Sequence, residues 1–258
     1  MPLTNSLDTD DLRAQRAGQT DPLVQYIVVR RERVPSLPLL LASVAQAVAI
    51  ADRRFSLDDN WAESVEAWRK SSFRKVTLRA NEKDWPKLLS AHVATTWPEE
   101  DPYVAVLPPR PRSEVGRFLS KLQAYTIDAG SLPDSPAPPI RELAMIIAPN
   151  PQLASMSVGK LSAQIGHAVL LCSQATTYFT ADMIWAEAGM AWEQAGRPVI
   201  ISFPHEAAWQ RALAGDNAIV VTDAGFTEIA AGSQTVLALR PSQGDELKRN
   251  LEILPPLR

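Results

Sequence analysis

The stretch of sequence that decides the fold is Ser157–Val158–Gly159–Lys160–Leu161–Ser162–Ala163–Gln164–Ile165–Gly166–His167–Ala168. At about 100° per residue, the angle of an α-helix, Lys160, Gln164 and His167 fall on one narrow stripe. The apolar side chains fall on a second stripe: Leu161, Ile165, Ala168 and Cys172. The stretch therefore predicts a helix with one face in a core and with a cation, an amide and an imidazole aligned along another face.

The start of this helix can also be read from the sequence. Ser157 can cap the helix, and Gly159 is expected to leave the amides of the first turn open to an approaching anion. An amphipathic helix whose polar stripe simply faces water would show the same pattern. The helix alone therefore does not separate a binding site from a solvated face.

A second stretch carries polar residues between two apolar runs, residues 218–221 and 236–239. It reads Asp223–Ala224–Gly225–Phe226–Thr227–Glu228–Ile229–Ala230–Ala231–Gly232–Ser233–Gln234–Thr235. The flanking runs predict two strands, so this stretch is expected to be the loop between them. Together, the pattern G-K-x-x-A-Q-x-x-H-A on the helix and D-A-G-x-T-x-I-x-x-G-S-x-T in the loop resemble the type II peptidyl-tRNA hydrolase family. The resemblance covers about Leu143 to Leu254.

The resemblance implies hydrolysis of the ester bond of peptidyl-tRNA, which releases the peptide and free tRNA. It implies peptidyl-tRNA as the partner. We expect no metal, cofactor or membrane to take part. Carried over residue by residue, the implied catalytic set is Lys160, Gln164, Asp223 and Thr227. The resemblance gives His167 and Thr235 a supporting role, and the full expected substrate-binding set is Gly159, His167, Phe226, Ser233 and Thr235.

These residue types suit the implied chemistry. Lys160 near a helix N-terminus suits a phosphate or a developing oxyanion, and Asp223, its expected partner, can orient the attacking water. Gln164 and Thr227 are neutral donors and acceptors that can fix the carbonyl or the ribose. The alternatives are a structural ion pair between Lys160 and Asp223, and a packing role for His167.

One position departs from the family pattern. The family usually has an arginine between Gly225 and Thr227, where this chain has Phe226. The absence of that cation weakens the case for a phosphate contact at the loop, although an aromatic ring can stack on a base. Two alternatives to the peptidyl-tRNA hydrolase therefore stay open. One is a non-catalytic or repurposed member that binds tRNA or a protein, and the other is a hydrolase of another acylated nucleotide ester.

Composition and charge set further limits. The chain has 258 residues, of which 46% are hydrophobic, and this length suffices for two modest domains. The sequence has no run of about 18 apolar residues, and its N-terminus lacks an apolar signal core. The single cysteine, Cys172, cannot form an internal disulfide, so we expect a cytoplasmic location. The net charge of −3 is an objection to a polyanionic partner.

Other catalytic signatures fail when they are tested against the sequence. Gly159-Lys160 is not a P-loop, because Leu161 follows the lysine and Ala154 stands where the first glycine is needed. A serine hydrolase would need a G-x-S-x-G elbow, which the sequence lacks. The three histidines and the cysteine are scattered and predict no metal site.

The chain divides into two similar halves joined by a proline-rich segment. Residues 1–21 lack periodicity and predict a disordered tail. The run L-P-D-S-P-A-P-P predicts a linker over residues 131–140. On either side of it strands alternate with helices, which indicates an α/β fold. Trp61-Ala62-Glu63 recurs as Trp185-Ala186-Glu187, which indicates a duplication.

The predicted architecture is two tandem copies of a small mixed-sheet α/β sandwich with helices on both faces. Residues 22–130 would be a degenerate copy of the peptidyl-tRNA hydrolase-like domain, and residues 141–258 the catalytic copy. We expect the copies to pack as an internal pseudo-dimer, which allows the protein to be a monomer. The helices Trp61–Trp68 and Trp185–Trp192 are the expected seam. The first copy is expected to end in an amphipathic helix over Glu114–Tyr125.

The first copy lacks the candidate site residues but carries many of the basic ones. Leu39, Ser43 and Gln46 stand where the second copy has the lysine, glutamine and histidine of its motif helix. The second copy is net acidic. We therefore expect the first copy to attract tRNA through four cations: Arg69, Lys70, Arg74 and Lys75.

Overall fold

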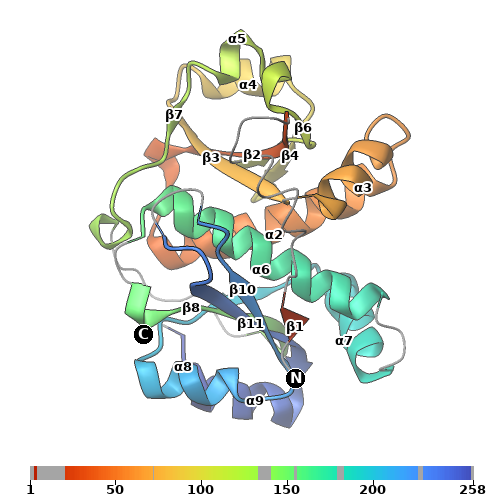
Figure 1. Cartoon of the computed structure of the whole chain (residues 1–258), viewed down its shortest axis with the longest axis vertical. Helices are drawn as coiled ribbons and strands as arrows, with labels where there is room; N and C mark the ends of the chain where they lie inside the picture. The colour runs from red at the N-terminus through yellow and green to blue at the C-terminus, as the bar shows by residue number, and fades with distance from the viewer. Residues whose placement is uncertain are drawn as a thin grey trace.

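The computed structural model describes residues 21–71, 73–132, 141–153, 156–178, 183–225 and 229–256, together with the backbone of residues 3–4. Its strands form two mixed sheets, one in each half of the chain, and helices cover both faces of each sheet (Figure 1). The predicted α/β class with mixed sheets is therefore confirmed.

The sheet of the N-terminal half has the strand order β4-β5-β2-β3-β7, and β6 pairs with β2. The strands are β2 (Leu23–Arg30), β3 (Arg74–Ala80), β4 (Thr95–Trp97), β5 (Val104–Val106), β6 (Arg110–Pro111) and β7 (Gln123–Ala124). The helices of this half are α2 (Leu37–Ser56), α3 (Ala62–Lys70), α4 (Trp85–Ala91) and α5 (Gly116–Leu119). Short 3-10 turns follow β2 and β6 and end the half: η1 (Arg31–Arg33), η2 (Arg112–Glu114) and η3 (Ala129–Ser131).

The sheet of the C-terminal half has the order β1-β10-β11-β8-β9. The strands are β1 (Leu3–Thr4), β8 (Leu143–Pro149), β9 (Val199–Ile201), β10 (Ala218–Thr222) and β11 (Gln234–Gln243). The helices are η4 (Pro151–Leu153), α6 (Val158–Tyr178), α7 (Met183–Gln194), α8 (Glu206–Leu213) and α9 (Gly244–Ile253). The predicted motif helix is thus present as α6.

The two halves share an arrangement of four strands, to which β6 and β7 are added in the N-terminal sheet and β1 in the C-terminal sheet. In each half one strand (β2 or β8) is parallel to the next (β3 or β9) and antiparallel to a later strand (β5 or β11), which pairs antiparallel with the strand before it (β4 or β10). A local detail recurs as well, because Trp68 Nε1 donates to Arg74 O at 2.9 Å and Trp192 Nε1 donates to Pro198 O at 2.8 Å. Phe73 and Arg197 lie five residues after these tryptophans, and both have a left-handed φ, 55° and 57°. These likenesses support the duplication, which stays a prediction together with its pseudo-twofold packing.

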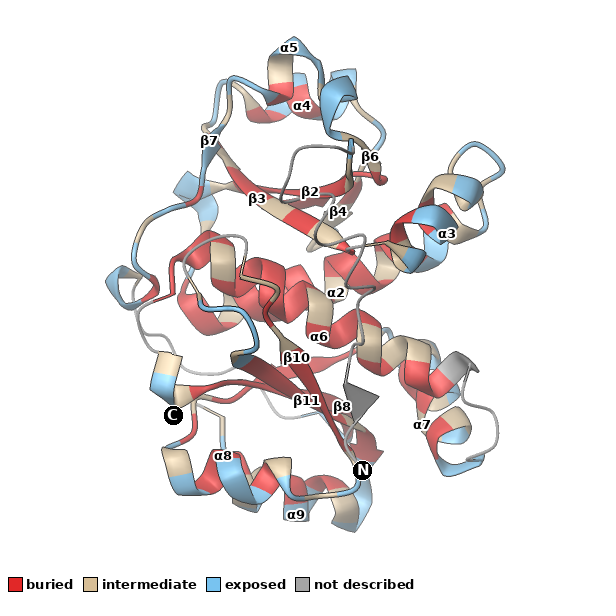
Figure 2. Cartoon of the chain, viewed as in Figure 1, coloured by how far each residue is buried: buried red, intermediate tan, exposed pale blue. Residues whose placement is uncertain are grey.

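Helices α2 and α6 pack against each other between the two sheets (Figure 1). The alternation of side chains along β8 shows how this layer is built, because successive residues of a strand point to opposite faces. Leu143, Met145 and Ile147 belong to the core that contains α2 and α6. Ala144, Ile146 and Ala148 belong to a second core, with side chains of α8 and α9. Figure 2 shows the resulting buried middle layer.

The sequence of α2 explains why it occupies this layer. The helix is apolar on nearly every side, with Leu40, Leu41 and Val44 fully buried, and a helix of that kind is stable only inside a protein. Its start is set by Ser36, whose side chain accepts a hydrogen bond from the Leu39 amide at 3.5 Å, and by Pro38 in the first turn.

A glycine of α6 lies where the halves meet. A Cβ atom at Gly166 would lie 3.0 Å from Lys75 Cδ and 3.5 Å from Val48 Cγ2, both in the N-terminal half. The expectation that the tryptophan helices form the seam is wrong, because α2 and α6 form it. Helix α3 packs on α2, and α7 packs on α6.

The end of the N-terminal half differs from the expected helix over Glu114–Tyr125. The chain forms the short helix α5 and then β7, whose Ala124 and Gln123 pair with Leu78 and Arg79 of β3. Pairing with the edge of the sheet therefore outweighs the amphipathic pattern in this segment.

Parts of the predicted tail and linker lie outside the described residues. Of residues 1–21, Leu3 and Thr4 pair in parallel with β10, Asp21 accepts a hydrogen bond from the Ser113 amide at 3.1 Å, and the others are not described. Residues 133–140 of the linker are likewise outside the described part. Among the helices of the described residues, none is long and apolar enough to cross a membrane.

Because the two halves share a core, we expect them to unfold together. Leu41 is fully buried in the shared layer, and the substitution Leu41→Ala should lower the free energy of unfolding by about 2–5 kcal/mol. Native-state hydrogen exchange should show that the amides of β2 and β8 lose the same amount of protection. Loss of protection in β2 with unchanged protection in β8 would contradict a shared core.

Candidate active site

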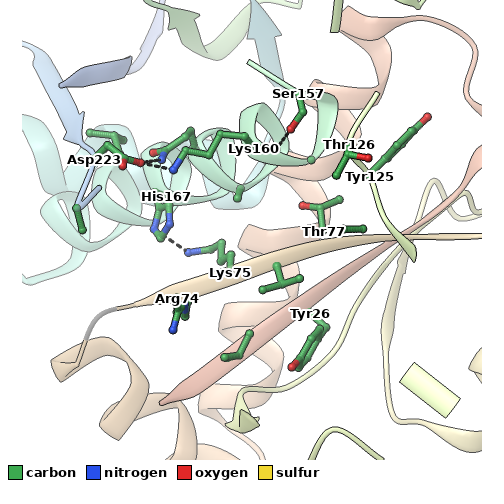
Figure 3. A pocket seen from close by; sticks show the side chains of 18 of the residues that line it. Tyr26, Arg74, Lys75, Thr77, Tyr125, Thr126, Ser157, Lys160, His167 and Asp223 are labelled. Atoms are coloured by element: carbon green, nitrogen blue, oxygen red, sulfur yellow. Dashed lines mark hydrogen bonds and ion pairs between the residues drawn. The ribbon is translucent and has the colours of Figure 1, made fainter. Parts of the chain in front are cut away.

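Three of the predicted catalytic residues meet in one hydrogen-bonded network (Figure 3). Lys160 Nζ forms an ion pair with Asp223 Oδ2, and Gln164 Nε2 donates to the same oxygen at 2.6 Å. Thr235 Oγ1 donates to Gln164 Oε1 at 3.0 Å. Lys160 and Gln164 are one helical turn apart on α6, so their side chains reach Asp223 from the same face. The structure thus joins Lys160, Gln164, Asp223 and Thr235.

The loop after β10 holds Asp223 in place. The Gly225 amide donates to Asp223 Oδ1 at 2.7 Å, and the Asp223 amide donates to Ser233 O at 2.8 Å. Gly225 has a φ of 73°, and a Cβ atom there would lie 2.7 Å from the Ala231 Cβ atom. Only glycine meets both requirements, so the D-A-G sequence is a structural requirement of this loop. Ser233 contacts Asp223 through its backbone carbonyl, and its role in substrate binding stays a prediction.

The network is buried, which raises the strength of its electrostatic interactions. Asp223 is 5% exposed, Gln164 4% and Thr235 0%, whereas the Lys160 side chain is 12% exposed. A buried carboxylate needs partners for its charge, and here a cation, a side-chain amide and a backbone amide supply them. Lys160, the most exposed member, is the group best placed to meet a ligand.

Two predicted site residues cannot be placed. Thr227, expected to be catalytic, and Phe226, expected to contact the substrate, lie outside the described residues. Their assigned roles stay predictions.

The start of α6 differs from the expectation. The Val158 amide donates to Ile127 O at 2.8 Å, the Gly159 amide donates to Tyr125 O at 2.7 Å, and the Lys160 amide donates to Ser157 Oγ at 3.2 Å. The prediction of open first-turn amides is therefore wrong, because the end of the N-terminal half occupies them. A Cβ atom at Gly159 would lie 2.6 Å from Tyr125 O, so this glycine permits the contact. Its role in substrate binding stays a prediction.

His167 faces the N-terminal half. Its Nδ1 atom lies 3.2 Å from Lys75 Nζ, and its ring centroid lies 5.4 Å from that of Phe73. Lys75 Nζ in turn lies 3.9 Å from the centroid of the Phe73 ring and 4.6 Å from that of Trp68. Burial lowers the pKa of His167 well below its ordinary value, and the charges of Lys75 and Lys160 lower that pKa further. Burial also lowers the pKa of Lys75 well below its ordinary value.

The network opens into a pocket of about 450 Å³ between α6 and the edge of the N-terminal sheet. Residues of both halves line it (Figure 3). The sequence analysis missed the part of the wall that the N-terminal half supplies: Tyr26, Thr77, Arg112, Tyr125 and Thr126, with Arg74 known only as a cation. No local pattern could have placed these residues opposite Lys160, because they approach it only through the packing of α2 on α6.

The four cations expected to hold tRNA do not form one surface. Arg69 is paired through two nitrogens with the buried Asp52, at 3.1 and 2.6 Å. Lys75 is buried against His167, and Lys70 pairs with Glu66 at 2.6 Å on the surface. Of the four, Arg74 and Lys75 line the pocket. The expectation that these four cations together bind tRNA is therefore wrong, because they do not share one surface.

Other kinds of catalytic centre find little support in the described residues. Burial raises the pKa of the Cys172 thiol far above its ordinary value, so this cysteine is not a ready nucleophile. Within the same residues there is no group of three or more histidine, cysteine or acidic side chains suited to hold a metal ion.

The lowered pKa of His167 predicts how stability depends on pH. The pKa of His167 in the folded protein lies below the ordinary value of 6.5. The contribution of the neutral imidazole to the free energy of unfolding is therefore fully present above pH 6.5. As the pH falls from there towards the folded-state pKa, the unfolded chain binds the proton first and this stability is lost. The variant His167→Asn should lose less stability than the wild type between about pH 7.5 and 5, as measured by chemical denaturation. Parallel losses in the two proteins would contradict a neutral, partly buried His167.

Comparison with known proteins bears on the C-terminal half. No curated protein matches the chain significantly. Residues 143–256, however, match the model of the family described as Peptidyl-tRNA hydrolase PTH2. The matched region begins with β8 and contains the whole Lys160–Gln164–Asp223–Thr235 network. The C-terminal half of this chain is therefore similar to the peptidyl-tRNA hydrolases of the PTH2 family.

Proposed function

We propose that this protein hydrolyses the ester bond of peptidyl-tRNA at the Lys160–Asp223 network. The observation that carries the proposal is the buried ion pair at the pocket wall, oriented by Gln164 and Thr235 within the region that matches the family. A positioned carboxylate beside a cation is suited to an ester, which needs an oriented water and a group that stabilises negative charge.

In the proposed reaction, Asp223 accepts a hydrogen bond from the attacking water and aligns it with the ester carbonyl. The water oxygen bonds to the carbonyl carbon, and Lys160 stabilises the negative charge that develops on the carbonyl oxygen. The bond between that carbon and the ribose oxygen then breaks. The ribose oxygen takes up a proton, which balances the proton that the attacking water gives up. The peptide leaves as a carboxylic acid that ionises at neutral pH.

Gln164 is assigned a positioning role. An amide side chain can present its nitrogen or its oxygen to Asp223, and only the nitrogen donates. The hydroxyl of Thr235 donates to Gln164 Oε1 and so leaves Nε2 turned towards the carboxylate. Thr235 therefore acts through Gln164 on the orientation of Asp223.

A second candidate is the hydrolysis of a smaller acylated nucleotide ester. The wall supplied by the N-terminal half bounds the pocket opposite Lys160, and its volume of about 450 Å³ is typical of small-molecule sites. Comparing turnover of peptidyl-tRNA with turnover of the same acyl group on adenosine separates the two candidates. The leading proposal expects the larger kcat/KM with peptidyl-tRNA.

The network should be required for turnover and not only for stability. Lys160→Met and Asp223→Asn should each lower kcat by about 100-fold or more, since each removes a positioned charge. Each single variant leaves one buried partner unpaired, so its thermal midpoint should also fall.

The double variant Lys160→Met/Asp223→Asn distinguishes the two roles. It carries no unpaired charge, so its thermal midpoint should recover while its activity stays low. Recovery of activity together with stability would show that the pair is structural, and the assignment would then fail.

The positioning role of Thr235 can be tested with a substitution of nearly equal shape. Thr235→Val removes the hydroxyl and should lower kcat by about tenfold with little change in KM, because Gln164 loses its orientation. Thr235→Ser restores the donor and should restore most of kcat. Equal kcat values for all three proteins, measured by release of free tRNA, would contradict this role.

A further inference from the structure

The pocket extends from the Lys160–Asp223 network to the edge strand β3 of the N-terminal sheet, which a further strand pairs with over part of its length. On one side, β3 pairs with β2 along its whole length, from Arg74 to Ala80. On the other side, β7 pairs only with Leu78 and Arg79. Residues 74–77 line the pocket along this second side. Thr77 O accepts a hydrogen bond from the Tyr125 amide at 3.1 Å, next to β7. Within the described chain, no strand pairs with residues 74–76 on this side.

Neighbouring residues of β3 point to opposite sides of this edge. Lys75 points towards α6 and His167, whereas Arg74 points to the other side, where Tyr26 lies (Figure 3). The pocket is lined by all four of these residues, so it wraps around the edge of the strand. A ligand that reaches from Asp223 to Arg74 must therefore be an extended molecule and not a single small ion.

The far end of the pocket is rich in guanidinium groups. Arg74 and Arg112 line it, and the charges of Arg112, Arg110 and Arg74 act on the hydroxyl of Tyr26, against the smaller opposing effect of the Asp21 carboxylate. Arg74 is half-buried, and its pKa is lowered first by burial and then by the nearby charge of Arg112. In the described lining, Asp223 supplies the carboxylate, and the network holds that carboxylate at the opposite end. Like charges gathered in a partly buried site favour an anion.

We propose that Arg74 and Arg112 bind backbone phosphates of the nucleotide strand whose terminal ester lies at Lys160 and Asp223. Guanidinium groups suit phosphates because they offer several donors in a planar arrangement. The strand would cross the edge of β3 between the two ends of the pocket. The identity of the ligand as the ester-bearing strand rests on the proposed function. The subsite itself rests on the shape and charge of the pocket.

This subsite answers the objection that the chain has a net charge of −3. The attraction for a polyanion would come from a local concentration of cations in the N-terminal half and not from the whole surface. The half that lacks the catalytic network would thereby complete the site.

Binding of a short single strand tests the subsite without any need for turnover. The probes are a single-stranded RNA trinucleotide and the same trinucleotide with uncharged methylphosphonate linkages. Arg74→Gln and Arg112→Gln should each weaken binding of the charged trinucleotide by about tenfold or more, and should leave binding of the uncharged one unchanged. The salt slope of binding should become shallower by about 0.7 for each phosphate that the variant no longer neutralises.

The control is Arg117→Gln, which removes an exposed arginine of α5 that does not line the pocket. It should bind both trinucleotides as the wild type does. If Arg74→Gln fails to fold, Arg74→Lys keeps a charge at that position, and the exposed Arg112 can be replaced without loss of a buried group. Unchanged binding of the charged trinucleotide in the Arg74 and Arg112 variants would overturn the proposal, as would equal losses for both probes.

Turnover separates this proposal from the proposed function. The same acyl ester is placed on adenosine and on the trinucleotide. Arg112→Gln should lower kcat/KM about tenfold for the acylated trinucleotide and leave that for acylated adenosine unchanged. If neither ester is hydrolysed by the wild type while binding depends on the phosphates, the proposed function fails and the subsite stands. If Arg112→Gln and the wild type hydrolyse both esters with the same kcat/KM, the subsite proposal fails and the proposed function stands.

Discussion

The packing of α2 against α6 is the contact on which the rest of the structure depends. Both helices lie between the two sheets, and the side chains that cover them come from both halves of the chain. Neither sheet could keep its inner face away from water without this layer. Because α6 also carries Lys160 and Gln164, the contact that completes the core sets the distance between the Lys160–Asp223 network and the N-terminal half. The packing of α2 against α6 therefore determines both the fold and the geometry of the pocket.

Within the pocket, the two halves supply different chemistry. The C-terminal half supplies a buried carboxylate whose two oxygens are fixed by Lys160, Gln164 and the Gly225 amide. The N-terminal half supplies cations and carbonyl groups, and the carbonyls of Tyr125 and Ile127 occupy the first amides of α6. An anion drawn to this pocket would therefore meet side-chain cations and not the helix terminus. The N-terminal half, which lacks the motif residues, thus supplies part of the pocket wall.

Local patterns predicted part of the network, and the family resemblance implied the rest. Helical periodicity placed Lys160 and Gln164 on one face, and the apolar runs around the loop placed Asp223 and Thr235 at the ends of two strands. The resemblance implied that Asp223 lies beside Lys160 and Gln164, and the hydrogen bond from Thr235 to Gln164 was not predicted. The failures all involve contacts between distant segments. The amides of Val158 and Gly159 are taken by carbonyls more than thirty residues away, as the bonds to Ile127 and Tyr125 show.

The burial of charged groups could not be predicted for the same reason. Arg69 and Lys75 resemble a solvated basic run in the sequence, but a buried carboxylate on α2 pairs with one and the imidazole of α6 contacts the other. Residues 114–125 have an amphipathic pattern, but the unpaired edge of β3 recruits Gln123 and Ala124 into a strand. Tertiary packing decides such cases, because local propensity is worth less than a buried contact or a sheet pairing.

The central claim is that this pocket adds water to an ester. Its most direct test is incubation of the wild-type protein with peptidyl-tRNA in water enriched in ¹⁸O, followed by analysis of both products. The account predicts release of tRNA with a free terminal hydroxyl, and a peptide that carries one ¹⁸O atom in its new carboxylate. Intact peptidyl-tRNA after incubation with the folded protein would contradict it, as would released peptide without the label.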